Sequence, residues 1–94
     1  MNGYHVIWPA HVRQDVLRFI AQTLSGTGRE TAELNQALAA IEDGLVRRPT
    51  VAGESRVGSL RVLVEGPVCV GYRVDVATRR VTVAFARYSR GKRL

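Results

Sequence analysis

The chain has 94 residues, of which 46% are hydrophobic and 6% aromatic, a composition typical of one small globular domain and unlike that of a disordered tail. Its single cysteine, Cys69, excludes an internal disulfide framework. The sequence has no long apolar run and no charged-then-apolar leader, so we expect a cytoplasmic protein without a membrane partner. One domain is predicted over residues 1–94.

The net charge of +6 is distributed unevenly along the chain. Residues 1–45 carry three basic and five acidic side chains, whereas residues 46–94 carry eleven basic and three acidic ones. Thirteen of the fourteen basic residues are arginines, whose planar guanidinium groups bind phosphate oxygens in pairs. A GC-rich genome explains much of the arginine excess, but it does not explain the clustering. The clustering indicates a polyanionic partner.

The first half of the chain predicts a short strand followed by two helices. Residues 4–8 form a β-branched and aromatic run that Pro9 ends, which indicates a strand. Residues 10–24 follow with apolar side chains at helical spacing: Val12, Val16, Phe19, Ile20 and Leu24.

The second helix follows a break at residues 25–28, whose sequence is Ser-Gly-Thr-Gly. We expect Thr27 or Gly28 to cap its start and Pro49 to close it. Its apolar positions are Leu34, Leu38, Ile41 and Leu45. Because the connection is short, the two helices should form an antiparallel hairpin.

After a predicted loop over residues 49–58, the apolar period changes from helical to two. Strands are predicted over residues 60–65, 68–76 and 80–88, joined by turns at Gly66-Pro67 and residues 77–79. The alternation assigns these residues to the core: Leu60, Val62 and Val64, then Val68, Val70, Tyr72, Val74 and Val76, then Val81, Val83 and Phe85.

The predicted fold class is α+β, a strand, two helices and a three-stranded antiparallel meander, with the helical hairpin packed on one face of the sheet. On this assignment Arg61 and Arg73 emerge on the other face, next to the edge and tail residues Arg56, Arg87 and Arg90. A basic sheet face is therefore the first candidate for a functional surface.

The element order and several local segments resemble the RelE/ParE family of toxins from bacterial type II toxin-antitoxin modules, also described as plasmid-stabilisation proteins. The resemblance covers nearly the whole chain. It rests on residues 4–8 (YHVIW), 39–45 (AAIEDGL), 60–68 (LRVLVEGPV), 72–75 (YRVD) and 80–88 (RVTVAFARY).

The resemblance implies a cognate antitoxin as partner and three alternative activities. The first is a ribosome-dependent endonuclease that cleaves mRNA without a metal. The second is a non-enzymatic inhibitor of DNA gyrase, as in ParE. The third is a degenerate relative that binds its antitoxin without being toxic. The family's metal-free chemistry implies no cofactor.

The site residues that the resemblance implies are nearly all arginines. Arg61 matches a basic position on the first meander strand, Arg87 lies near one after the last strand, and Tyr88 is the late tyrosine available for proton transfer. These three are the candidate catalytic residues. Candidate nucleic-acid contacts are Arg56, Arg73, Arg90 and Lys92.

Other features of the sequence favour readings other than RNA cleavage by these residues. Cys69 precedes Tyr72 in the middle strand, where RNA-cleaving members commonly have an arginine, and this favours a gyrase inhibitor or a non-toxic relative. The arginines also fit a solvated sheet face, and Tyr88 fits a packing residue. His5 and His11 have no third ligand nearby in the sequence, so no metal site is expected.

Overall fold

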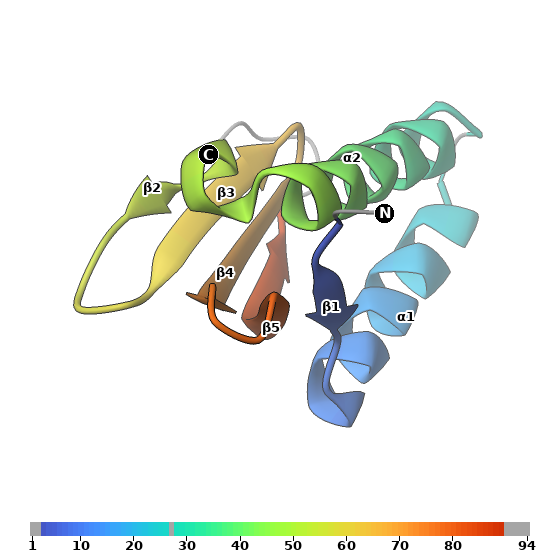
Figure 1. The fold of residues 1–94 in the computed structure, drawn as a ribbon. Coiled ribbons are helices and arrows are strands. Elements are labelled where there is room, and N and C mark those ends of the chain that lie inside the picture. Colours follow the sequence, from blue (N-terminus) through green and yellow to red (C-terminus); the bar gives the residue numbers. More distant parts are fainter. Residues whose placement is uncertain (1–2, 27, 90–94) are drawn as a thin grey trace.

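The computed structural model describes residues 3–26 and 28–89 and confirms the α+β class, with helices packed on one face of a sheet (Figure 1). The elements in chain order are β1 (His5–Ile7), α1 (Ala10–Leu24), α2 (Gly28–Arg47), α3 (Pro49–Ala52), β2 (Glu54–Ser55), β3 (Arg61–Glu65), β4 (Val68–Asp75) and β5 (Arg80–Tyr88). None of the described helices combines the length and apolar character needed to cross a bilayer.

The sheet has five strands in the order β1-β5-β4-β3-β2. Strands β3, β4 and β5 form the predicted antiparallel meander, and β1 joins β5 in parallel, with His5 opposite Arg80. Strand β2 pairs antiparallel with the free edge of β3. Strand β2 was not predicted, because Glu54 and Ser55 are polar and too few for an alternating pattern.

The predicted loop over residues 49–58 is wrong in its first half. Pro49 begins the one-turn helix α3, and Ala52 ends it. Proline suits the first turn of a helix because the amide hydrogen that it lacks has no partner there. The same residue therefore both ends α2 and starts the next turn.

Helix α1 has its predicted bounds, but one position of its predicted apolar face is wrong. Val12 is fully buried, whereas Leu24 is 72% exposed. Thr23 takes the buried position at the end of the helix, where its hydroxyl donates to the carbonyl oxygen of Ile20 at 2.7 Å and lies 3.2 Å from the hydroxyl of Thr31. A threonine fits there because both helices supply hydrogen-bond partners.

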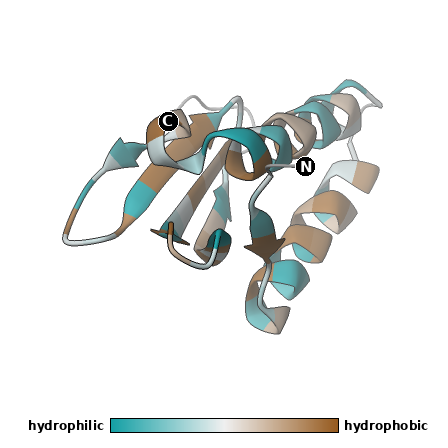
Figure 2. Ribbon diagram, in the orientation of Figure 1, coloured by the Kyte–Doolittle hydropathy of each residue, from teal (hydrophilic) through white to brown (hydrophobic). Residues whose placement is uncertain are grey.

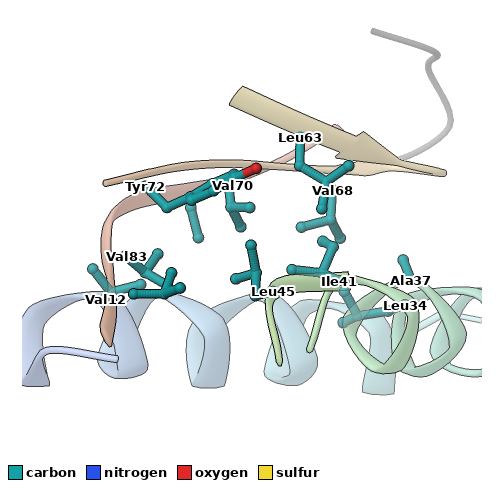
Figure 3. Close-up of a cluster of buried hydrophobic side chains, with 12 residues drawn as sticks. Val12, Leu34, Ala37, Ile41, Leu45, Leu63, Val68, Val70, Tyr72 and Val83 are labelled. Carbon is teal, nitrogen blue, oxygen red and sulfur yellow. The ribbon is translucent and has the colours of Figure 1, made fainter. Parts of the chain in front are cut away.

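Helix α2 carries the larger share of the helical core. Leu34, Ile41 and Leu45 are completely buried, and Leu38 is half-buried. Figure 2 shows hydrophobic and hydrophilic residues alternating along both long helices. In Figure 3 the helical side chains point towards those of the sheet; the buried hydrophobic residues are Val12, Leu34, Ala37, Ile41, Leu45, Leu63, Val68, Val70, Tyr72, Val81, Val83 and Ala86.

The predicted faces of β3 are reversed. Leu63 is buried under the helices, whereas Val64, assigned to the core, is 45% exposed. Apolar residues are contiguous from Val62 to Val64, so alternation alone does not decide which side is inward. Pairing with β4 decides it, because Leu63 lies opposite the buried Val70.

Strands β4 and β5 follow the prediction until a register shift at Gly71 and Tyr72. Tyr72 lies opposite Val83 and Gly71 opposite Phe85, which leaves Ala84 as an extra residue in β5. The shift places Phe85 on the face away from the helices, so its assignment to the core is wrong. Val76 was also assigned to the core, but it lies beyond the end of β4 and is 59% exposed.

Candidate functional site

Arg61 lies on the face of the sheet that the helices cover, which corrects its predicted place on the other face. It is opposite the buried Tyr72 in the pairing of β3 with β4. A terminal guanidinium nitrogen of Arg61 donates a hydrogen bond to the carbonyl oxygen of Gly53, and its Nε is buried without a partner. Arg61 therefore contacts the protein's own backbone at the end of α3.

Tyr72 makes a second contact to the same segment. Its hydroxyl donates to the carbonyl oxygen of Pro49 at 2.7 Å, and the side chain is fully buried. A Cβ atom on Gly53 would lie 2.7 Å from this hydroxyl, so only glycine fits beside it. Arg61 and Tyr72 together hold residues 49–53 against the sheet, and we call this pair the clasp.

Tyr88 and Arg87 point to opposite faces because they are consecutive in β5. Tyr88 lies opposite Val68 on the helix side, and its ring centroid is 5.6 Å from that of Phe19 in α1. Arg87 lies opposite Cys69 on the other face. The structure therefore does not bring the three candidate catalytic residues into one site.

Arg61 and Tyr88 are also distant along the strands. Their partners in β4 are Tyr72 and Val68, which are four residues apart. At the usual rise of a strand this separation is about 13 Å. Arg61 would have to release its carbonyl partner to approach Tyr88.

The two predicted nucleic-acid contacts that the structure describes, Arg56 and Arg73, lie in different places. Arg73 and Arg87 both lie on the face away from the helices. Arg56 is exposed between β2 and β3, where a guanidinium nitrogen is 3.5 Å from a carboxylate oxygen of Glu54. Arg90 and Lys92 lie outside the described residues.

The face of the sheet that the helices leave uncovered is more apolar than the sequence suggested. The strand pairings place these side chains on it, and we call it the uncovered face: Glu54, Val62, Val64, Cys69, Arg73, Asp75, Arg80, Thr82, Phe85 and Arg87, with Gly71 at the centre. Val62, Cys69 and Phe85 are half-buried, Val64 is exposed, and Arg73 and Arg87 flank them. The predicted basic face is an apolar patch with arginines around it, of which Arg80 lies opposite Asp75 at the far end of β4.

Phe85 is held in the middle of the uncovered face. Its ring lies directly over Gly71, where a Cβ atom would be 2.2 Å from a ring carbon. The guanidinium carbon of Arg87 is 4.8 Å from the ring centroid, which is the geometry of a cation–π contact. Phe85 is thus in contact with backbone at Gly71 and with a cation at Arg87.

A second feature lies on the other side of the molecule, between α1 and α2, and the sequence did not reveal it. It is an apolar groove of about 340 Å³, lined by Trp8, Arg13, Val16, Leu17, Leu38 and Glu42. The Trp8 indole nitrogen donates to a carboxylate oxygen of Glu42 at 3.0 Å, which fixes the ring at the rim. The one signal in the sequence is Leu17, an apolar residue outside the predicted core face of α1, which is 64% exposed.

The histidines and the cysteine do not form a site. In residues 3–26 and 28–89, no three side chains of the histidine, cysteine, aspartate and glutamate types come close enough to hold a metal ion. His5 is exposed on β1, and the His11 Nε2 is 3.4 Å from the carbonyl oxygen of Ala84. Cys69 is a half-buried free thiol.

Comparison with known proteins gives matches to structures alone. No protein-family model and no curated protein matches the sequence. A chain of the chromosomal ParDE toxin-antitoxin system of P. aeruginosa matches with a TM-score of 0.71 and 13% identity, over 95% of this chain and 99% of that one. A chain of the RelBE2 toxin-antitoxin complex of Mycobacterium tuberculosis matches with a TM-score of 0.62 and 19% identity, over 92% and 98% respectively.

The chain has the RelE/ParE fold. Both matches cover nearly the whole of both chains. The family resemblance seen in the sequence is therefore confirmed at the level of the fold. At these identities the likeness does not extend to individual functional residues.

Proposed function

We propose that this RelE/ParE-like chain is the toxin subunit of a type II toxin-antitoxin pair. The observation that carries the proposal is the structural match, over nearly the full length, to chains from two toxin-antitoxin complexes. The open apolar groove between α1 and α2 supports it, because a groove of this kind accepts the apolar side chains of an amphipathic segment.

The groove suits an amphipathic antitoxin segment. Its lining includes the apolar residues Val16, Leu17 and Leu38 and one charge of each sign, from Arg13 and Glu42. An apolar side chain of the partner would contact the apolar lining, and the two charges would favour one direction of the bound segment. Such helix-in-groove binding relies on a few apolar anchors.

For the toxic activity we propose binding to a protein target, of the gyrase-inhibitor type, rather than RNA cleavage. Metal-free RNA cleavage needs phosphate-binding cations and a proton-transfer group converging on one point. Here Arg61 is occupied by the carbonyl of Gly53, and Tyr88 packs on Phe19 on the face opposite Arg87. This separation favours a surface that binds over one that catalyses.

A ribosome-dependent endonuclease is the second candidate. Arg73 and Arg87 support it, because both lie on the uncovered face and neither has a carboxylate within ion-pair distance in the described part of the chain. Two free guanidinium groups on one face are able to bind phosphate.

Controlled expression in a bacterium separates the two candidates. Translation and replication are followed separately by pulse labelling, and transcript ends are mapped in the same culture. We expect replication to stop first with transcripts intact. Early loss of translation with new cuts in ribosome-bound mRNA would establish the endonuclease, and normal growth would refute a toxin.

A matched pair of variants tests whether the groove binds the antitoxin. Leu17 and Leu24 are both exposed leucines of α1, but only Leu17 lines the groove. We expect Leu17→Arg to prevent copurification with the protein encoded by the neighbouring gene, and Leu24→Arg to leave it unchanged. Equal retention of the partner by both variants would exclude the groove.

A further inference from the structure

We propose that the uncovered face binds an acidic amphipathic segment of a target protein. The inference rests on the proposed function only in taking the chain to act by binding, and it concerns a surface separate from the groove between α1 and α2. The proposed partner segment presents an apolar stripe with carboxylates beside it.

The apolar part of the uncovered face crosses three strands. Val62 and Val64 come from β3, Cys69 from β4 and Phe85 from β5. Val62 lies opposite Gly71, and Val64 opposite Cys69, so the four side chains adjoin one another. Gly71 adds no side chain between them, and the strand pairings extend the patch from β3 across β4 to β5.

The positive charges of Arg73 and Arg87 favour an acidic partner. Arg73 and Arg87 flank the patch, and neither is neutralised by an ion pair within residues 3–26 and 28–89. Of the acids on this side, Glu54 pairs with Arg56, and Asp75 lies at the far end of β4, opposite Arg80, where its carboxylate accepts a hydrogen bond from the amide of Thr78 at 3.2 Å. A partner would therefore supply the missing carboxylates.

The same geometry disfavours single-stranded nucleic acid. Base stacking needs an open aromatic face. Phe85, the aromatic residue in the middle of this face, lies against Gly71 and carries the guanidinium group of Arg87 at 4.8 Å. Val62, Val64 and Cys69 make up the rest of the patch and give bases no stacking platform.

A second copy of the chain also fits poorly. Two uncovered faces packed together would bring Arg73 and Arg87 of one copy near those of the other. These guanidinium groups would repel one another at an apolar interface and be costly to remove from water. An acidic segment removes this cost, because each guanidinium gains a charge-assisted hydrogen bond.

The binding test uses a labelled helical peptide of roughly five turns, with leucines at every third or fourth position and glutamates beside them. One control peptide keeps the leucines and replaces glutamate by lysine. A second keeps the glutamates and replaces leucine by serine. A single-stranded RNA of similar length is the fourth probe. Binding to the full chain is measured by fluorescence anisotropy.

We expect the acidic leucine peptide to bind about tenfold or more tightly than either control peptide. Val64→Ser and Arg73→Ala should each weaken it several-fold. The matched controls are Val57→Ser, in the exposed loop before β3, and Arg29→Ala on α2, which should bind unchanged. Circular dichroism checks that every variant is folded.

Four outcomes would overturn the inference. They are equal binding of the acidic and lysine peptides, tighter binding of the RNA with the same dependence on Arg73, a concentration-dependent dimer that Val64→Ser dissociates, and an antitoxin whose binding requires Val64 and Arg73. A chain that binds the acidic peptide but leaves growth normal would refute the toxin proposal and leave this inference standing.

Discussion

The two faces of the sheet carry similar residue types and differ in what covers them. Both contain valines, an aromatic residue and arginine. On the helix side Tyr72 and Arg61 both hold residues 49–53 through backbone carbonyls. On the uncovered face Phe85 and Arg87 contact each other and leave the patch open to a partner. Residue type alone therefore does not distinguish a structural arginine from a binding one.

The largest expected difference in the free energy of unfolding is between valine-to-alanine substitutions on the two faces of the sheet. Val70 is fully buried and Val64 is 45% exposed. Val70→Ala should lower the free energy of unfolding by about 2 kcal/mol, because it leaves a cavity under the helices. Val64→Ala should cost about 0.5 kcal/mol or less. Urea denaturation at constant m-value measures both, and equal losses would contradict the assignment of the two faces.

The next largest loss of stability is expected at the clasp. Tyr72→Phe removes the hydroxyl that binds the Pro49 carbonyl, and that buried oxygen loses its partner. We expect a loss of about 1.5 kcal/mol in the free energy of unfolding, within the range for an unsatisfied buried polar group. Faster amide hydrogen exchange over residues 49–55 should accompany it. Unchanged exchange there would show that Tyr72 does not hold this segment.

Alanine substitution of Arg61 and of Arg73 compares an arginine that stabilises the fold with one on the surface. Arg61→Ala should lower the free energy of unfolding by about 1 kcal/mol, because the carbonyl of Gly53 loses a charge-assisted donor. Arg73→Ala should change it by less than about 0.5 kcal/mol. If Arg61→Ala abolished toxicity while stability stayed constant, Arg61 would be a functional residue and the clasp would be secondary.

The smallest effect tests how Phe85 is seated. Gly71→Ala places a methyl group against the ring of Phe85, and this flexible side chain must move aside. We expect a loss of up to about 1 kcal/mol from the displaced ring and its contact with Arg87. The double variant with Phe85→Leu should recover part of the loss. Strictly additive losses would show that the ring does not lie over Gly71.

Much of the fold was predictable because its signals are local. The bounds of α1 agree with the prediction, and the turn at Gly66 has the positive φ of 52° that favours glycine. The candidate site was far less predictable. The groove depends on the spacing of two helices, and the sequence shows only that Leu17 lies outside the predicted core face of α1, not that it lines a groove.

The sequence by itself determined the first strand, the helical hairpin, the antiparallel meander and the excess of arginine in the second half, but not α3 or β2. The features that it determined depend on period, turn residues and composition, which are properties of neighbouring residues. Only the tertiary structure decided which side of β3 faces inward and where the extra residue of β5 lies. Both depend on pairing between strands distant in the sequence, and that pairing directs Arg61 towards Gly53 and Phe85 onto the uncovered face.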